Sequence, residues 1–388
     1  MKASPPSFRR LALLGATGSI GRQVCDLVER YPDRFALSVA VGGSDSAALQ
    51  ALQARHPSAR MLLARAADAS DEEAARRIAD AVSDPAVDLV VVAISGSAAL
   101  APTLAALDAG KDVALATKEV LVMAGSLVRQ RMAQHGSRLL PIDSEHSAIW
   151  QCLWGERPES VRRLIVTGSG GPFLRRPIES LQRVTIAEAL AHPRWKMGPK
   201  ITVDSATMMN KGLEIIEAHF LFELPITAID VVVHPESVVH SMVEFVDGSI
   251  KAQLGQPDMH LPIAIALAYP DRLDRVTAPP DLVSLGRLTF EALDPVRYPA
   301  VGLARAAATR GGVAPAILNA ANEEAVALFL DGLCGFTDIV PLVEHALEAA
   351  DESHEVTLDQ VLAADRRARA QVKAANAGRA SLRSTLPA

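Results

Sequence analysis

The chain has 388 residues, more than one hydrophobic core usually serves, so two or three domains are expected. Hydrophobic residues make up 49% of the sequence and charged residues 22%, which excludes a disordered or fibrous chain. The net charge of -6 argues against nucleic acid as the main partner, because phosphate backbones demand a concentrated basic surface.

The first 145 residues alternate short apolar runs with longer segments of helical period. The predicted strands cover residues 11–14, 37–41, 89–94, 113–116 and 139–142. The predicted crossover helices cover residues 22–31, 47–55, 72–82, 98–109 and 119–135. This alternation predicts an α/β domain over residues 1–145, with a doubly wound, Rossmann-like parallel sheet.

The remaining sequence divides into three parts. Residues 146–269 combine a predicted helix at 212–220 with strand-like alternation at 231–245, which indicates an α+β domain with an open sheet of a kind that often dimerises. Residues 270–300 are rich in proline and read as a linker. The last part, 301–388, has helical spacing at 315–330, 339–350 and 358–374 and predicts a helical bundle.

Nothing in the sequence indicates export or a membrane span. The first ten residues lack the apolar stretch of a signal peptide, and the apolar runs at 87–94 and 261–268 are far shorter than the roughly 20 residues that a membrane helix needs. Cys25, Cys152 and Cys334 are odd in number and far apart, which disfavours a disulfide framework or a zinc site. A cytoplasmic protein is expected.

A glycine-rich loop follows the first predicted strand. Its residues Thr17, Gly18, Ser19 and Ile20 open the first helix, where backbone amides can approach a pyrophosphate; a tight turn without a ligand is the alternative. The second strand does not end in the Asp or Glu that an NAD enzyme uses. Gly42, Gly43 and Ser44 stand there and leave room for a 2′-phosphate, so NADP is preferred, with a plain flexible turn as the alternative.

Charged residues follow two later strands of the same predicted sheet. Lys118 and Glu119 come after one strand, and Asp143 and Glu145 come after the next. Residues two apart on an extended backbone point the same way, so both carboxylates are expected to face one cation. Carboxylates without Cys favour Mg²⁺ or Mn²⁺, and Glu214 is a candidate for the third. Taken singly, these residues also fit a surface ion pair and a helix cap.

Three further segments offer groups that suit an anionic substrate. The loop at 167–173 contains Ser169, and its hydroxyls and amides suit a phosphate. The loop at 192–198 combines His192, Trp195 and Met197 with several cations, as a lid over an anion would. The segment from 204 to 214 offers Ser205, Asn210 and Lys211, and a helix there puts Asn210 and Glu214 on one face. Alone, each segment also fits a turn, a packed Trp or solvent-facing helix charges.

Eight motifs in one order carry a resemblance that spans nearly the whole chain: GATGSIG, ATKE, DSEHSAIWQ, TGSGGPF, HPRWKMG, DSATMMNKGLE, HPESVVHSMVEF and NAANE. Together they resemble the 1-deoxy-D-xylulose 5-phosphate reductoisomerase family. The resemblance implies a metal-assisted rearrangement of that sugar phosphate and reduction by NADPH to 2-C-methyl-D-erythritol 4-phosphate, in non-mevalonate isoprenoid biosynthesis. It also implies a homodimer.

The resemblance further implies residue roles. Asp143, Glu145 and Glu214 would hold the metal, and Lys118 and Ser144 would contact the substrate near the reacting carbons, with Lys118 and Glu145 as the catalytic groups. Phosphate would be bound by Ser169, Ser205, Asn210 and Lys211, and the lid would contain His192, Trp195 and Met197. Thr117, Glu119 and Gly198 would lie beside NADPH. Relatives often carry a basic or amide residue in place of Gly43 and Ser44 and Asn in place of Thr117, which leaves the NADPH affinity open.

Two other functions compete with this interpretation. Another NADP-linked dehydrogenase, such as a semialdehyde dehydrogenase, would need a cysteine nucleophile, for which Cys152 is the positional candidate. A non-catalytic NADP-binding protein would keep the cofactor fold and have no use for the carboxylates.

Overall fold

The computed structural model describes residues 8–64, 71–195, 197–349 and 356–385. The chain forms two compact units, and neither is continuous in sequence. Unit 1 consists of Met1–Val120, Val128–Gln151 and Asp258–Pro280, and unit 2 of Leu121–Leu127, Cys152–Pro257 and Asp281–Ala388. The predicted division at residues 145, 269 and 300 does not coincide with these bounds, because residues 258–280 join the N-terminal unit. The division into three domains and a linker stays a prediction.

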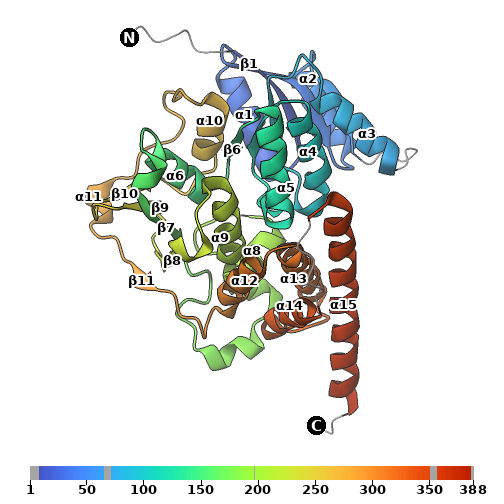
Figure 1. The fold of residues 1–388 in the computed structure, drawn as a ribbon, viewed down its shortest axis with the longest axis vertical. Helices are drawn as coiled ribbons and strands as arrows, with labels where there is room; N and C mark the ends of the chain where they lie inside the picture. The colour runs from blue at the N-terminus through green and yellow to red at the C-terminus, as the bar shows by residue number, and fades with distance from the viewer. Residues whose placement is uncertain (1–7, 65–70, 196, 350–355, 386–388) are drawn as a thin grey trace. The chain divides into compact units, whose positions relative to one another are not determined.

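Unit 1 is built on a parallel sheet of six strands, drawn from blue to teal in Figure 1. The strand order is β3-β2-β1-β4-β5-β6. The strands are β1 Arg9–Leu14, β2 Phe35–Gly42, β3 Arg60–Leu63, β4 Leu89–Val92, β5 Asp112–Leu115 and β6 Leu139–Pro141. The chain runs outward from β1 in one direction and from β4 in the other. This order confirms the predicted doubly wound fold and puts its switch point between β1 and β4, where such sheets bind ligands.

Helices cover both faces of this sheet, so its strands are buried on both sides, as parallel sheets usually are. On one face, Leu11 and Leu13 pack with Leu27 of α1 and Ile263 of α10 in a single apolar cluster. The helices of unit 1 are α1 Ser19–Arg30, α2 Ser46–Arg55, α3 Asp71–Val82, α4 Leu100–Asp108, α6 Ser144–Leu153 and α10 His260–Ala268. α5, Glu119–His135, has non-helical dihedral angles at Ala124, within the stretch that belongs to unit 2.

Unit 2 contains a mixed sheet in the order β10-β9-β7-β8-β11. Its strands are β7 Val161–Gly168, β8 Ile229–Val233, β9 Val239–Phe245, β10 Ile250–Leu254 and β11 Glu291–Ala292. β7 and β8 are parallel, and the other pairs are antiparallel. The predicted linker therefore contributes an edge strand, β11, to this sheet.

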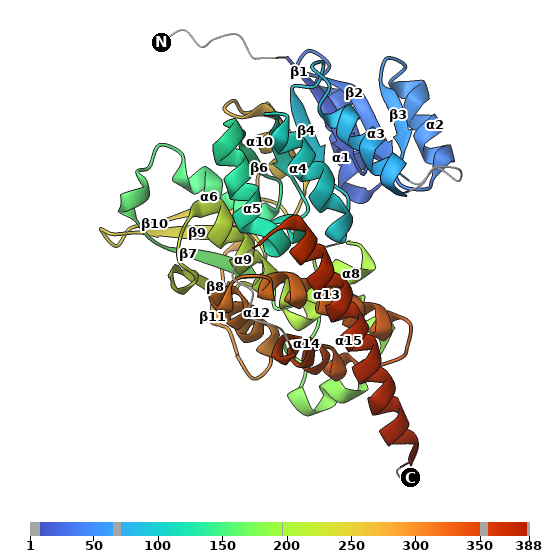
Figure 2. The same ribbon diagram turned by 45° about the vertical axis from the view of Figure 1, so that its right-hand side comes forward.

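Helices between β7 and β8 and at the C-terminus complete unit 2. They are α7 Ile186–Ala189, α8 Pro199–Thr207, α9 Met209–Phe222, α11 Leu282–Leu285, α12 Pro299–Arg310, α13 Ala314–Leu330, α14 Ile339–Glu348 and α15 Leu358–Thr385. α15 packs along α13 and α14 (Figure 2), and α12 packs against α9. One apolar cluster joins Val203 of α8, Leu213 of α9, Ala304 of α12 and Ile317 of α13. The predicted α+β region and C-terminal helices are confirmed, and they share one core.

Short 3-10 helices lie at Gly96–Ala99, Pro158–Ser160, Ile178–Arg183, Ile226–Ala228 and Phe336–Asp338. Over the described ranges, no helix has both the length and the apolar character that crossing a bilayer would require.

Candidate functional site

The loop after β1 has the backbone geometry of a dinucleotide-binding turn. Gly15 has φ +90°, and a Cβ there would overlap the carbonyl of Ala93. A Cβ at Gly21 would overlap the carbonyl of Gly15, so both positions require glycine for the chain to turn back on itself. α1 begins at Ser19, and its N-cap Gly18 offers no side-chain hydrogen bond. The first amides of α1 are therefore available to an anion.

The second turn of unit 1 leaves space beside this loop. A Cβ added at Gly43 would meet nothing within 4 Å. The carboxylate of Asp45, which follows, accepts a hydrogen bond from Ala48 N at 2.9 Å and caps α2. At the end of β5, Thr117 Oγ1 donates to Ile94 O at 2.5 Å, and Glu119 is buried in the first turn of α5. The predicted cofactor residues of unit 1 thus follow β1, β2 and β5, at the carboxyl edge of one sheet.

Two carboxylates and a lysine meet after β5 and β6. Lys118 Nζ lies 2.6 Å from Asp143 Oδ2, and both side chains are buried. Asp143 and Glu145 offer carboxylate oxygens within 4.8 Å of one another. Ser144 Oγ donates to Glu145 Oε2 at 2.6 Å. The prediction that Asp143 and Glu145 lie on an extended backbone was wrong. α6 begins at Ser144, so Glu145 lies in a helical turn, and its N–H donates to Asp143 Oδ1 at 3.1 Å.

His146 is a member of this cluster that the sequence analysis missed. It is fully buried, and its Nδ1 lies 2.9 Å from Asp143 Oδ1. The carboxylate of Asp143 is therefore held from both sides, by Lys118 and by His146. The signal was present in the sequence, because residues three apart share a helix face, but the segment was interpreted as extended.

In unit 2 the second glycine-rich loop packs closely against α8 and α9. A Cβ at Gly171, where φ is +66°, would lie 2.6 Å from Ser205 O. One at Gly168 would lie 3.1 Å from Cε of Lys211. Ser169 Oγ accepts a hydrogen bond from Gly171 N at 3.2 Å. The absence of side chains at these glycines thus brings Ser169, Ser205 and Lys211 together.

His192 connects this loop to the predicted lid. Its Nδ1 accepts hydrogen bonds from Arg194 N at 3.2 Å and Trp195 N at 2.9 Å, so this nitrogen carries no proton. Nε2 then bears the hydrogen and lies 3.3 Å from Ser169 Oγ. Burial, and next the positive charge of Lys211, lower the pKa of His192 to about 4. The imidazole is neutral at physiological pH. Met197 is half-buried, and Lys196 lies outside the described residues.

α9 brings together the other predicted phosphate and metal residues. Glu214 is fully buried; it accepts hydrogen bonds from Asn210 Nδ2 at 2.5 Å and Lys211 Nζ at 2.7 Å. The prediction that Asn210 and Glu214 share a helix face is confirmed. α9 follows Met208, whose φ of +59° lets the chain turn between α8 and α9.

The predicted site residues divide between the two units. Unit 1 carries Thr17, Gly18, Ser19, Ile20, Gly42, Gly43, Ser44, Thr117, Lys118, Glu119, Asp143, Ser144 and Glu145. Unit 2 carries Ser169, His192, Trp195, Met197, Gly198, Ser205, Asn210, Lys211 and Glu214. Unit 1 therefore has the features of a dinucleotide site next to a pair of hard oxygen ligands, and unit 2 has those of an anion site next to a third carboxylate.

Cys152 does not have the environment of a nucleophile. Its side chain is buried, and this burial raises the pKa of the thiol to about 11. The thiolate that a semialdehyde dehydrogenase needs is therefore disfavoured at neutral pH.

Comparison with known proteins shows one enzyme family along most of the chain. Residues 11–125 match the family model for 1-deoxy-D-xylulose 5-phosphate reductoisomerase, and residues 139–222 and 254–371 match models for C-terminal domains of the same enzyme. The chain is 50% identical over 378 residues to the reductoisomerase of Xanthomonas oryzae pv. oryzae, covering 94% of this chain and 96% of that one.

Solved structures agree as well. The reductoisomerase from Zymomonas mobilis in complex with NADPH has a TM-score of 0.87 and 40% identity, covering 95% of this chain and 99% of its own. A reductoisomerase in complex with NADPH, fosmidomycin and magnesium also has a TM-score of 0.87 and 40% identity, with 95% and 98% coverage. These sequence identities, over nearly the full length of both chains, show that the chain belongs to the 1-deoxy-D-xylulose 5-phosphate reductoisomerase family.

Proposed function

We propose that the protein converts 1-deoxy-D-xylulose 5-phosphate to 2-C-methyl-D-erythritol 4-phosphate with NADPH and a divalent cation, as a step of non-mevalonate isoprenoid biosynthesis. The observation that carries this proposal is membership of the family along 94% of the chain, with half of the aligned residues identical. The clusters in both units support it, since each offers the type of group that one part of this reaction requires.

Asp143, Glu145 and Glu214 are the proposed ligands of Mg²⁺ or Mn²⁺. The donor set fits such an ion, because it consists of carboxylate oxygens, which hard cations prefer. The bound cation would polarise the carbonyl and the adjacent hydroxyl of the substrate. In each unit a lysine already compensates the buried charge, Lys118 beside Asp143 and Lys211 beside Glu214.

Lys118, Ser144 and Glu145 are the proposed groups at the reacting carbons. The ammonium of Lys118 can stabilise negative charge that develops on a substrate oxygen during the rearrangement. The hydroxyl of Ser144 donates to Glu145, so this pair can hold a proton beside the substrate. We assign the proton transfer to Glu145.

Ser169, Ser205, Asn210 and Lys211 are the proposed phosphate ligands. Ser169 Oγ already accepts a hydrogen bond from Gly171 N, and the hydrogen on His192 Nε2 points to the same oxygen, so the hydroxyl proton of Ser169 can be donated to a phosphate oxygen. Lys211 adds a positive charge. The neutral ring of His192 accepts a hydrogen bond from the backbone N–H of Trp195. We propose that the side chains of Trp195 and Met197 close over the bound substrate.

NADPH would supply the hydride that reduces the rearranged aldehyde. Thr17, Gly18, Ser19 and Ile20 suit its pyrophosphate, because the first turn of α1 presents uncapped amides. Gly42, Gly43 and Ser44 are proposed beside the 2′-phosphate, because a Cβ at Gly43 would meet nothing within 4 Å. Thr117, Glu119 and Gly198 are proposed beside the nicotinamide half.

The experiment that tests the function is the initial rate of NADPH oxidation with 1-deoxy-D-xylulose 5-phosphate. The protein is first treated with a chelator, and the rate is then measured with and without added Mg²⁺ or Mn²⁺. Oxidation that depends on both the sugar phosphate and the metal is expected. A protein that binds NADPH but oxidises none of it under these conditions would be a sensor or a different dehydrogenase.

We also infer a homodimer. β10 is an edge strand that, within the described residues, pairs with β9 alone, and Ile250 and the neighbouring Val246 are 52% and 65% exposed. An unpaired edge with apolar side chains is suited to association with another chain. Light scattering should give twice the 41.1 kDa of one chain, and Ile250→Asp should shift the mass toward one chain. A wild-type mass of one chain would contradict the inference.

We also propose that the protein is located in the cytoplasm. This location is supported by Cys25, Cys152 and Cys334, none of which forms a disulfide in the described part of the chain, as suits a reducing environment. Cell fractionation with periplasmic and cytoplasmic marker enzymes would test it.

A further inference from the structure

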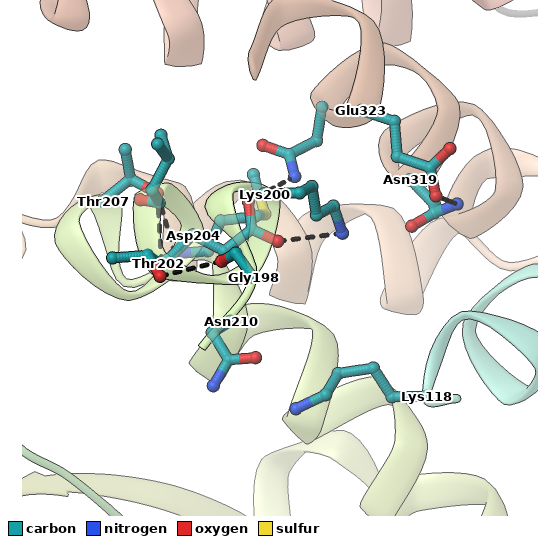
Figure 3. Close-up of polar contacts among 12 residues, drawn as sticks. Lys118, Gly198, Lys200, Thr202, Asp204, Thr207, Asn210, Asn319 and Glu323 are labelled. Atoms are coloured by element: carbon teal, nitrogen blue, oxygen red, sulfur yellow. Dashed lines mark hydrogen bonds and ion pairs between the residues drawn. The ribbon is translucent and has the colours of Figure 1, made fainter. Parts of the chain in front are cut away.

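Asp204 lies one residue before the proposed phosphate ligand Ser205, and it is a fully buried carboxylate outside the metal and phosphate sets. It belongs to α8, and both of its oxygens are engaged. Lys200 Nζ forms an ion pair with Oδ2 at 2.9 Å (Figure 3). Asn322 Nδ2 donates to Oδ1 at 2.8 Å. Lys200 is on the same helix, whereas Asn322 is on α13, 118 residues further along the chain.

Asn322 belongs to the NAANE motif, to which the proposed reaction assigns no role. Its side chain is fully buried, and its Oδ1 has no hydrogen-bond partner within the described residues. The orientation of the amide follows from charge, because the reverse orientation would put its oxygen against the carboxylate of Asp204. A carboxylate and an amide in this position therefore form a directional contact between α8 and α13, which apolar packing would not provide.

α13 is itself joined to α15 by a charged contact. Asn319, one turn before Asn322, donates to Glu323 Oε1 at 3.1 Å, and Glu323 Oε2 accepts a hydrogen bond from Arg369 of α15 at 2.5 Å. Arg369 also donates to Asp365 at 2.7 Å. The contact from Asn322 to Asp204 thus starts from a helix that the pair of Glu323 and Arg369 joins to α15, whereas the bond from Asn319 to Glu323 lies within α13.

We propose that Asp204 is a positioning residue: through its contact with Asn322 of α13 it fixes the rotation of α8 about its axis and thereby the place of Ser205 in the phosphate site, while Lys200 of the same helix holds the carboxylate in its orientation. This inference rests on the proposed function. An α-helix turns by about 100° per residue, so fixing the direction of Asp204 fixes that of Ser205. A rotation of about 10° would move a side-chain oxygen about 5 Å from the axis by about 1 Å. Displacements of that size are large for a substrate-binding group.

The close packing of α8 would pass such a rotation on to the neighbouring phosphate ligand. The carbonyl of Ser205 lies where a side chain of Gly171 would be, so the loop that carries Ser169 rests against the end of α8. A shift of α8 therefore displaces two of the proposed phosphate ligands together.

The test compares two buried asparagines of α13. Asn322→Ala removes the contact to Asp204, and Asn319→Ala, its matched control, removes an equally buried amide that contacts Glu323 instead. The measurements are kcat and KM for 1-deoxy-D-xylulose 5-phosphate, the Kd of NADPH by fluorescence, and the thermal unfolding midpoint. We expect Asn322→Ala to raise the KM for the sugar phosphate by about 10-fold, with NADPH affinity within about 2-fold of wild type and Asn319→Ala within about 2-fold in both.

An exchange variant provides the rescue. Asp204→Asn alone should raise this KM, because the negative charge that faces Asn322 and Lys200 is lost, and the double variant Asp204→Asn with Asn322→Asp should restore part of it, because the contact again joins a carboxylate and an amide. An Asp204→Asn variant that fails to fold leaves the asparagine comparison intact.

Three outcomes would overturn the proposal. The KM could rise equally in both alanine variants, NADPH affinity could fall by the same factor as sugar phosphate affinity, or Asn322→Ala could be unfolded at the assay temperature while Asn319→Ala is folded. The last result would assign the contact to folding alone. Wild-type protein without any oxidation of NADPH by the sugar phosphate would instead refute the proposed function.

Discussion

His192 offers a sharp test of the unit 2 site, because its two ring nitrogens have different tasks. Nδ1 accepts the N–H groups of Arg194 and Trp195, and Nε2 faces Ser169. Asn in place of His192 keeps an acceptor near the position of Nδ1, whereas Gln extends toward the position of Nε2 and loses that acceptor. We expect His192→Asn to keep the KM for the sugar phosphate within about 10-fold of wild type and His192→Gln to raise it further, since Trp195 loses its anchor.

The pKa of His192 also determines how strongly this residue makes the stability of the protein depend on pH. Burial lowers this pKa to about 4, while an unfolded chain titrates near 6.5. Between these values the unfolded state binds more protons, so the histidine contributes stability that is complete above about pH 6.5 and is lost as the pH falls toward 4. The shift of about 2.5 units corresponds to about 3.4 kcal/mol for a fully buried group. Solvent around the partly exposed ring reduces this to about 1–2 kcal/mol.

Two measurements check this value. Titration of the histidine ring protons by NMR, with the His192 resonance assigned by its loss in His192→Asn, should give a pKa near 4. Urea unfolding at pH 7.5 and pH 4.5 should show that wild type loses about 1–2 kcal/mol more than His192→Asn between the two conditions. A measured pKa of 6 or higher, or equal losses in both proteins, would refute the assignment of a neutral, accepting imidazole.

Three further predictions concern the same unit. Glu214→Gln should weaken activation by Mg²⁺ at least about 10-fold while leaving NADPH affinity within about 2-fold, measured by metal titration of the rate and by fluorescence; unchanged activation would refute the metal assignment. Lys211→Met should raise the KM for 1-deoxy-D-xylulose 5-phosphate about 10- to 100-fold, because a charged hydrogen bond to phosphate is lost, and an unchanged KM would remove Lys211 from the phosphate site. Gly171→Ala should cost more free energy of unfolding in urea than Gly155→Ala. Both glycines have positive φ, which costs about 1–2 kcal/mol with a side chain, but only at Gly171 does the Cβ also overlap a carbonyl. Equal costs would show that Ser205 moves freely away.

Local patterns predicted the fold where they were long and periodic. Five of the six strands of the first sheet were expected, but β3 was not, because Arg60–Leu63 has four residues of which only Leu62 is buried. Its place is fixed by pairing with β2 rather than by its own sequence. The same holds for β11, a strand of two residues inside a proline-rich segment that pairs with β8.

Sequence motifs indicated the residues of the candidate site, which stay predictions, but they did not predict the contacts that these residues make. The motif order pointed to Asp143 and Glu145, yet the helix that starts at Ser144, and with it the place of His146 beside Asp143, depends on where β6 ends. The contact from Asn322 to Asp204 joins positions 118 apart, and no local spacing encodes it. Pairs of this kind depend on how the helices pack against one another, and this packing cannot be predicted from local patterns in a single sequence.

The interleaving of the two units along the chain has a consequence during synthesis. α10 packs against α1 and against β5 and β6, and its residues belong to the apolar cluster under the first sheet. The ribosome makes α10 more than a hundred residues after β6, so at about 5–20 residues per second the nascent sheet waits on the order of 5–20 s for this cover. Until α10 emerges from the exit tunnel, that face of the sheet is open to chaperones or to aggregation, and a ribosome stalled between residues 151 and 258 would hold the chain at its most vulnerable stage.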